Sequence, residues 1–511
     1  MNPRILRLVA CCCIGLVVLV NCAVPRPGGT VPLQVPKPAR LWIGAPAPEY
    51  LLGINETFWA TGTNGSGQSI AIIDTGITAS HEAFAGKSIN WTDVTRENYS
   101  MPVDLNGTEA GHGTMCASIA AGNSATYKGI APGADIAAIK MFYMDGGSIT
   151  AENADARAAV DRVLAIAPGL NIKVASLSWG DDNASDGNDE LSQIVEDLVD
   201  GGIVTVVAAG NKVSGGKPAR VAAPGASEKV LTVGSLDEHR FSVAYFSLPG
   251  PTADNRIKPD IIAPGVDIQG AQYDSTDQYN VLQGTSFSTP IVAGIAALLV
   301  GRYPSIDHYQ LKHLLCLTAL ESQYTSGNPD NQEGWGIVNP AGVVSAMERS
   351  WSLATPLAGS LCMNKSSTRS FFTRVHLATG VTHRFTITAG GEGNGMLDGR
   401  AEAYIYPASR DINGVPRLLA RSHGGKLLFA PGVEGDYILA IKPLPDAWSA
   451  EGGNLVVSFA ITHAEDLTIQ ASWGIGIASA VAGAVLVLAM ALNIRDSMTV
   501  KKLALWKKKG I

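Results

Sequence analysis

Ser286 has the residue type and the sequence surroundings of a serine nucleophile. It lies in the stretch GTSFSTPIVAG, between a Gly-Thr turn and apolar residues at helical spacing, which predicts a buried helix over residues 286–302. Backbone N–H groups at a helix start lack intrahelical partners and carry the positive end of the helix dipole, so they can hold an oxyanion. Pro290, one turn later, cannot donate a hydrogen bond to the carbonyl of Ser286. A serine in this position is more often an N-cap, so the nucleophile interpretation depends on other side chains.

Three further side chains could supply the rest of such a site. Asp74 ends the run SIAIID, His112 lies between two glycines just before a helical pattern, and Asn211 follows the run IVTVVAAG. A serine hydroxyl becomes an effective nucleophile when a neutral imidazole removes its proton, and a carboxylate fixes the tautomer of that imidazole. An amide N–H from Asn211 can stabilise the oxyanion. All four residues lie at strand ends or helix starts, so we expect them to meet at the carboxyl edge of a sheet.

Residues 50–347 alternate between short β-branched runs and helical patterns. Near-continuous apolar strands that alternate with helices are typical of a parallel sheet covered by helices on both faces. This region is therefore predicted to form one α/β domain. We predict strands at residues 69–74, 134–141, 173–178, 203–209 and 229–235, and helices at residues 112–121, 150–167, 190–201, 286–302 and 305–317.

Residues 355–465 have a different pattern. Runs with near-alternating apolar and polar residues follow one another there, separated by Gly, Pro and Asn turns, and no clear helical pattern interrupts them. Alternation with a period of two indicates strands that are buried on one side. We therefore predict a small all-β sandwich as an accessory domain after the α/β domain.

Four sequence blocks carry a family resemblance. DTGI around Asp74, HGTMCAS around His112, AAGN around Asn211 and GTSFSTPIVAG around Ser286 resemble the signature blocks of the subtilisin-like serine peptidases. The order Asp, His, Ser is also that of the family, and the resemblance covers residues 59–339. It implies a seven-stranded parallel sheet between helices, a triad of Asp74, His112 and Ser286, and an oxyanion hole that combines Asn211 with the Ser286 N–H.

The same resemblance implies where a peptide substrate lies. An extended peptide would add to the cleft as a further strand and fill the pocket for the residue before the cut. Trp179 stands where the family commonly has Leu or a small residue, so we expect its indole to narrow one subsite. The residues that the resemblance assigns to the cleft are Ser176, Leu177, Ser178, Trp179, Gly180, Ala208, Ala209 and Gly210.

The N-terminal residues predict export from the cytoplasm. Residues 1–23 contain Arg4 and Arg7 followed by a nearly unbroken apolar run, as in a secretory signal peptide. LVNC, which ends at Cys22, also resembles a bacterial lipoprotein cleavage box, although Asn precedes the cysteine, so lipidation there is an alternative. Residues 24–48 form a Pro-rich extension that is too short to fold alone, and the predicted peptidase domain, residues 49–348, follows it.

The C-terminal residues predict a membrane anchor. Residues 473–494 form a stretch of about 22 residues without a charge that begins with Trp473 and precedes a basic tail, residues 495–511. The positive-inside rule then predicts a transmembrane helix with a cytoplasmic C-terminus; a buried core helix is the alternative. We therefore expect a single-pass protein of the cell membrane whose catalytic domain is extracytoplasmic.

For several other residues, a structural role is a stronger hypothesis than a functional one. We expect His81 to have a structural role, and Cys116 to be a buried thiol beneath the site rather than a redox or metal residue. The acidic loop at residues 181–190 could bind Ca²⁺ or favour basic substrates, but a solvated loop in which Asp189 caps the next helix is the stronger hypothesis. Of the cysteines beyond the export segment, Cys316 and Cys362 could form a disulfide.

Together these patterns predict a membrane-anchored, extracytoplasmic serine endopeptidase that forms an acyl-enzyme on Ser286. One alternative is a membrane scaffold or secretion-machinery component with a peptidase fold, and another is a transpeptidase or macrocyclase on the same fold. The chemistry requires no cofactor, a structural Ca²⁺ is compatible with the resemblance, and the partner is a protein or peptide substrate. A net charge of −7 without interleaved basic and aromatic residues argues against nucleic-acid binding. No oligomeric state follows from the sequence.

Overall fold

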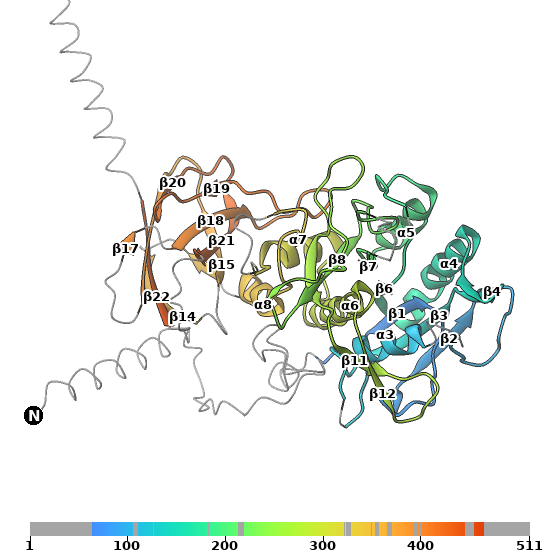
Figure 1. Cartoon of the computed structure of the whole chain (residues 1–511). Coiled ribbons are helices and arrows are strands. Elements are labelled where there is room, and N and C mark those ends of the chain that lie inside the picture. Colours follow the sequence, from blue (N-terminus) through green and yellow to red (C-terminus); the bar gives the residue numbers. More distant parts are fainter. Residues whose placement is uncertain are drawn as a thin grey trace, which may run out of the picture.

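The computed structural model describes most of the chain between residues 64 and 463. Figure 1 shows a sheet between layers of helices, followed by a group of strands that packs beside α7 and α8. The described residues are 64–105, 111–125, 127–181, 183–212, 219–320, 322, 329–348, 350–352, 357–364, 370–391, 397–398, 401–444 and 454–463.

Seven parallel strands form the central sheet, as the family resemblance implies. Their order is β10-β8-β7-β6-β1-β3-β2, and a short strand, β9 (Ser242–Val243), pairs antiparallel with β8. Except in the edge strand β2, nearly every side chain of these strands is buried, because helices cover both faces of the sheet. The parallel strands are β1 (Ser69–Asp74), β2 (Ile89–Asp93), β3 (Asp135–Lys140), β6 (Ile172–Leu177), β7 (Val204–Ala208), β8 (Leu231–Asp237) and β10 (Ile261–Pro264).

The helices divide between the two faces of the sheet (Figure 1). One core cluster joins the sheet to α3 (His112–Ala121), α6 (Thr285–Arg302), α7 (His308–Leu317) and α8 (Pro340–Glu348), and a second joins it to α4 (Asn153–Leu170) and α5 (Glu190–Asp200). The predicted helix at residues 305–317 begins three residues late because Asp307 caps it, accepting a hydrogen bond from the Gln310 N–H. A 3₁₀ turn, η1 (Glu82–Phe84), precedes β2.

Two antiparallel ribbons accompany the sheet, and the sequence patterns did not predict either of them. One pairs β4 (Tyr143–Asp145) with β5 (Ser148–Thr150), and the other pairs β11 (Ile268–Ala271) with β12 (Tyr279–Leu282). The first closes through Gly146 and Gly147, which both have positive φ angles, as a tight hairpin requires. Each strand is only three or four residues long, which is too short for an alternating pattern to stand out.

Beyond α8, strands form two five-stranded sheets. Their buried faces contribute to a separate apolar cluster, which includes Phe385, Leu439 and Ile441. The first sheet has the order β13-β15-β21-β18-β19, and the second has the order β14-β22-β16-β17 with β20 paired to β16. These strands are β13 (Ser350–Ser352), β14 (Leu357–Asn364), β15 (Phe371–Leu377), β16 (His383–Gly391), β17 (Leu397–Asp398), β18 (Ala401–Pro407), β19 (Ala420–Arg421), β20 (Lys426–Phe429), β21 (Gly435–Pro443) and β22 (Asn454–His463).

The two five-stranded sheets are joined to the α/β part by packing and by polar contacts. Phe372 and Tyr406 belong to the same buried cluster as the helices α6, α7 and α8. Arg410 forms an ion pair with Asp307 at 3.0 Å, and the ring of Trp335 meets that of Tyr406 edge-on. The strands after α8 therefore extend the core of the α/β part.

Several predictions fall on residues that the structure does not describe. The signal peptide (1–23), the Pro-rich extension (24–48), the transmembrane helix (473–494) and the basic tail (495–511) all lie outside the described residues. Within the described part, α6 is long and apolar enough to cross a membrane, but 83% of it is buried, as expected of a core helix. The suggested Cys316–Cys362 disulfide is not formed, because Cys316 is a buried free thiol in α7.

Candidate active site

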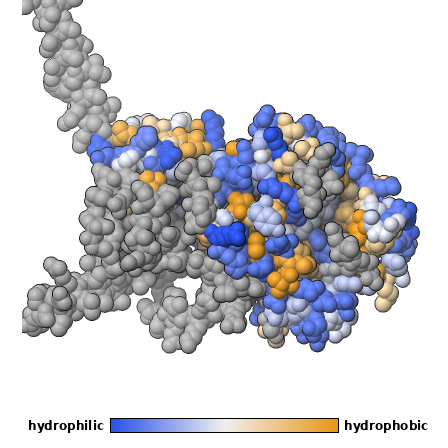
Figure 2. Space-filling view, viewed as in Figure 1, coloured by the Kyte–Doolittle hydropathy of each residue, from blue (hydrophilic) through white to orange (hydrophobic). Residues whose placement is uncertain are grey.

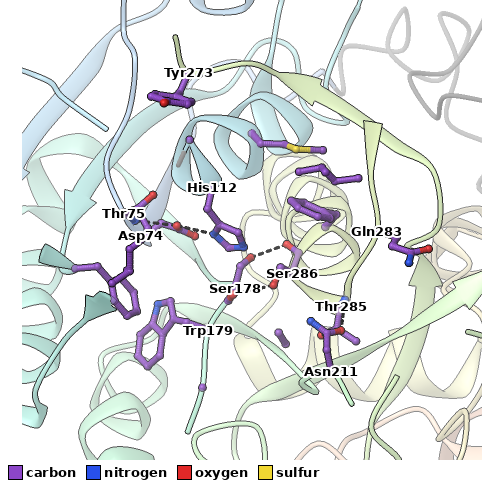
Figure 3. A pocket seen from close by; sticks show the side chains of 18 of the residues that line it. Asp74, Thr75, His112, Ser178, Trp179, Asn211, Tyr273, Gln283, Thr285 and Ser286 are labelled. Atoms are coloured by element: carbon purple, nitrogen blue, oxygen red, sulfur yellow. Dashed lines mark hydrogen bonds and ion pairs between the residues drawn. The ribbon is translucent and has the colours of Figure 1, made fainter. Parts of the chain in front are cut away.

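The buried Asp74 and the partly exposed His112 form a hydrogen-bonded pair at the carboxyl edge of the sheet. Asp74 is the last residue of β1 and His112 is the first residue of α3, and Nδ1 of His112 lies 2.8 Å from Oδ1 of Asp74 (Figure 3). Burial acts to lower the pKa of His112, but the adjacent Asp74 carboxylate outweighs it and raises that pKa well above 6.5. The carboxylate therefore stabilises a proton on the imidazole.

Glycine at position 113 allows this close approach of strand and helix. A Cβ atom at Gly113 would lie 2.3 Å from the carbonyl oxygen of Gly76 and 3.1 Å from Cβ of Asp74. Any larger residue would push the start of α3 away from the end of β1. Gly113 therefore permits the close contact between the end of β1 and the start of α3.

Ser286 lies in the first turn of α6, facing the same cavity as His112 (Figure 3). Its Oγ donates a hydrogen bond to the carbonyl of Ser178 at 3.1 Å. The carbonyl of Ser286 accepts hydrogen bonds from Ser178 Oγ at 2.8 Å and from Cys116 Sγ at 3.5 Å. Pro290 has no N–H to donate to this carbonyl, so the Ser178 hydroxyl and the Cys116 thiol donate to it instead. These two contacts hold Ser286 in place.

Cys116 is buried beneath the site, as the sequence predicted. It lies one turn after His112, and its Sγ is 3.9 Å from His112 Nδ1. Burial raises the pKa of the thiol above its ordinary value of 9.0. Among the described residues, Asp74, His112 and Cys116 are the group whose ligand atoms lie close enough to hold a metal ion, but a protonated thiol and an imidazole already paired with a carboxylate fit a proton-transfer site better.

Asn211 is held in one orientation by a residue that the sequence analysis did not single out. Oδ1 of Asn211 accepts hydrogen bonds from the N–H and the hydroxyl of Thr285, at 3.0 and 3.1 Å. The same hydroxyl accepts a hydrogen bond from the Gly210 N–H at 3.2 Å. Because Oδ1 is occupied by donors, the amide NH₂ group of Asn211 is left to donate elsewhere. The position of Thr285, directly before Ser286, was the available signal.

Asp104 is a second residue that the sequence analysis missed. Its buried carboxylate accepts hydrogen bonds from the Thr75 hydroxyl at 2.6 Å and from the Thr114 N–H at 2.8 Å. Thr75 follows Asp74 and Thr114 lies two residues after His112, so Asp104 ties the end of β1 to the start of α3. Burial raises the pKa of Asp104 and outweighs these hydrogen bonds, which act to lower that pKa.

A cavity of about 590 Å³ is lined by Asp74, His112, Asn211 and Ser286. Of the residues predicted to line the cleft, Ser178, Trp179, Gly180, Ala208 and Gly210 do so. The other three, Ser176, Leu177 and Ala209, are buried with at most 1% of their surface exposed, because the first two are still inside β6. The cleft wall in the structure is therefore shorter than the predicted one.

Trp179 is fixed against the wall of this cavity. Its Nε1 donates a hydrogen bond to the carbonyl of Ile73 at 2.8 Å, and its ring meets that of Phe142 edge-on at 6.1 Å. Figure 3 shows the indole beside Asp74, on the opposite side of Ser286 from Gln283. The indole is therefore a rigid part of the wall.

The remaining candidates have structural surroundings. Both ring nitrogens of His81 are occupied by backbone groups, since Nδ1 accepts from the Ala83 N–H and Nε2 donates to the Gln278 carbonyl. Asp189 caps α5 by accepting a hydrogen bond from the Ser192 N–H at 2.8 Å. The structural interpretations of His81 and Asp189 are thus confirmed.

The chain is similar to known proteins over about half of its length. The peptidase S8 subtilase family matches residues 65–336. The serine protease AprX of Bacillus subtilis (strain 168) is 35% identical over 276 residues, which cover 49% of this chain and 61% of AprX, less than two thirds of that relative. Thermitase of Thermoactinomyces vulgaris is 35% identical over 241 residues, covering 47% of this chain and 76% of thermitase. The solved structure of Sphericase covers 54% of this chain and 92% of its own, with 28% identity and a TM-score of 0.45.

Proposed function

Because this chain belongs to the subtilase family, we propose that it is a serine endopeptidase that hydrolyses peptide bonds through an acyl-enzyme on Ser286. The observation that carries this proposal is the Asp74–His112 hydrogen bond of 2.8 Å beside Ser286 in one cavity. A carboxylate, an imidazole and a hydroxyl in this order are what acyl transfer requires.

In the proposed reaction, neutral His112 removes the proton of Ser286 while Oγ bonds to the substrate carbonyl carbon. Asp74 stabilises the imidazolium that results, and the Asn211 amide and the Ser286 N–H hold the oxyanion. His112 then gives its proton to the leaving amine as the C–N bond breaks. Water, deprotonated by His112, releases the acyl group from Ser286 by the same steps.

The hydrogen bond between Ser286 and Ser178 suggests how substrate could prepare the nucleophile. An extended substrate would offer a backbone N–H to the Ser178 carbonyl, which now accepts from Ser286 Oγ at 3.1 Å. The displaced hydroxyl would then turn to His112. Catalytic hydrogen bonds commonly shorten in this way when substrate binds.

The rest of the chain is proposed to hold this site outside the cell. The signal pattern of residues 1–23 and the uncharged stretch 473–494 support a single-pass membrane protein with an extracytoplasmic peptidase and a cytoplasmic C-terminus. The strands after α8 are proposed to form a β-sandwich accessory domain, supported by their two sheets and shared core. The chemistry needs no cofactor, and a structural Ca²⁺ is compatible with it.

Labelling with a fluorophosphonate probe tests the proposal. The full-length protein, purified in detergent, should be labelled at one serine, and Ser286→Ala should abolish the labelling. Ser288→Ala is the matched control, since Ser288 lies in the same helix but its hydroxyl contacts Ser235 and the Ala263 carbonyl. A folded wild-type protein that is not labelled would overturn the proposal in favour of a scaffold.

A further inference from the structure

The side chains that border the cavity differ between the two sides of Ser286. On one side, the indole of Trp179 is fixed by its hydrogen bond to Ile73 and its contact with Phe142. Trp179, Phe142 and Ile149, the last from the β4–β5 ribbon, all line the cavity. The space there is bounded by three large apolar side chains, of which the indole is held in place by its hydrogen bond.

On the other side the cavity opens onto exposed apolar surface. Leu282, in β12, lines the cavity and is 48% exposed, and Tyr245 is 73% exposed. Gln283 joins them, because its Nε2 donates to the Tyr245 hydroxyl at 3.2 Å. Figure 2 shows apolar surface near the β11–β12 ribbon. We call Leu282, Gln283 and Tyr245 the open shelf.

The reaction decides which half of a substrate meets each side. The acyl half remains on Ser286 and lies along Ser178–Gly180, whose first carbonyl is 3.1 Å from Ser286 Oγ. The amine half leaves on the opposite side. Trp179 and Gln283 lie on opposite sides of Ser286 (Figure 3), so the amine half passes over the open shelf.

We propose that this peptidase selects its substrates by an apolar side chain after the scissile bond, bound on the open shelf, and accepts only small side chains beside Trp179 before that bond. The inference rests on the proposed peptidase function. Burying an apolar side chain against Leu282 and Tyr245 removes apolar surface from water on both partners, which favours binding. A bulky side chain before the bond would instead collide with the fixed indole.

Peptide-library cleavage by the full-length protein tests the shelf. Leu282→Ser should lower kcat/KM about 5- to 10-fold for peptides with Leu or Phe after the cut, and leave peptides with Ala there little changed. Val281→Ser is a matched control, because Val281 is equally exposed, at 48%, in the same strand but does not line the cavity. Equal losses in both variants would overturn the proposal.

Trp179→Leu tests the closed side. It should raise kcat/KM about 10-fold or more for peptides with large apolar residues before the cut, relative to peptides with small ones. An unchanged preference would overturn this part of the proposal. Titration with the fluorophosphonate probe distinguishes failure of this inference from failure of the proposed function. A labelled enzyme without these preferences contradicts only the inference. An unlabelled folded enzyme contradicts the peptidase function.

Discussion

Two histidines begin helices in this molecule, and their surroundings give them opposite properties. His112 begins α3 and donates from Nδ1 to the Asp74 carboxylate, which raises its pKa well above 6.5. His308 begins α7, and its Nε2 donates to the Lys229 carbonyl at 2.7 Å while Nδ1 accepts from the Thr205 N–H at 3.4 Å. Burial lowers the pKa of His308 to about 4.

The difference shows what distinguishes a candidate base from a structural histidine. Both nitrogens of His308 are occupied by backbone groups, so its ring is fixed and stays neutral. One nitrogen of His112 is held by a carboxylate, and the ring borders the cavity with 19% of its side chain exposed. A carboxylate on one side and a cavity on the other are therefore the informative features.

The largest expected effect is on catalysis. His112→Ala should lower kcat by about 10⁶-fold, the loss measured in subtilisin for removal of its catalytic histidine. The melting temperature should also fall, because the buried Asp74 carboxylate loses its hydrogen-bond partner. Single-turnover kinetics and thermal denaturation of the same preparation measure the two quantities. A loss of less than about 100-fold would contradict the role of His112 as general base.

The second effect is on stability. His308→Ala should lower the free energy of unfolding by about 2–4 kcal/mol, because the buried Lys229 carbonyl loses its donor and a cavity is left. Labelling of the folded fraction by the fluorophosphonate probe should be unchanged. His423→Ala, at an exposed histidine, is the control and should leave stability within about 0.5 kcal/mol. Chemical denaturation monitors both variants, and equal stabilities would contradict the structural role.

The smallest effect is the dependence of stability on pH, to which the two histidines should contribute with opposite signs. The raised pKa of His112 gives stability that is complete below 6.5 and is lost as pH rises through that raised pKa, while activity increases over the same interval. The lowered pKa of His308 makes stability fall as pH decreases from 6.5 to about 4, since only the unfolded state binds the proton. Profiles of kcat/KM and of melting temperature against pH test this. An acid limb of kcat/KM at or below 6.5 would contradict the raised pKa of His112.

Much of the fold could be predicted because its signals are local. The strand Ser69–Asp74 and the helix His112–Ala121 have the predicted bounds, since continuous apolar runs and glycines mark them in the sequence. The ribbons β4–β5 and β11–β12 could not be predicted, because strands of three or four residues carry too little pattern.

The sequence by itself determined the residue types of the candidate site and their order along the chain. Only the tertiary structure decided how each is held: Thr285 orients the amide of Asn211, Asp104 joins the residues beside Asp74 and His112, and Ile73 fixes the indole of Trp179. These partners lie far apart in the chain or carry no pattern of their own. Hydrogen bonds depend on distances and angles in space, which residue types and their spacing do not specify.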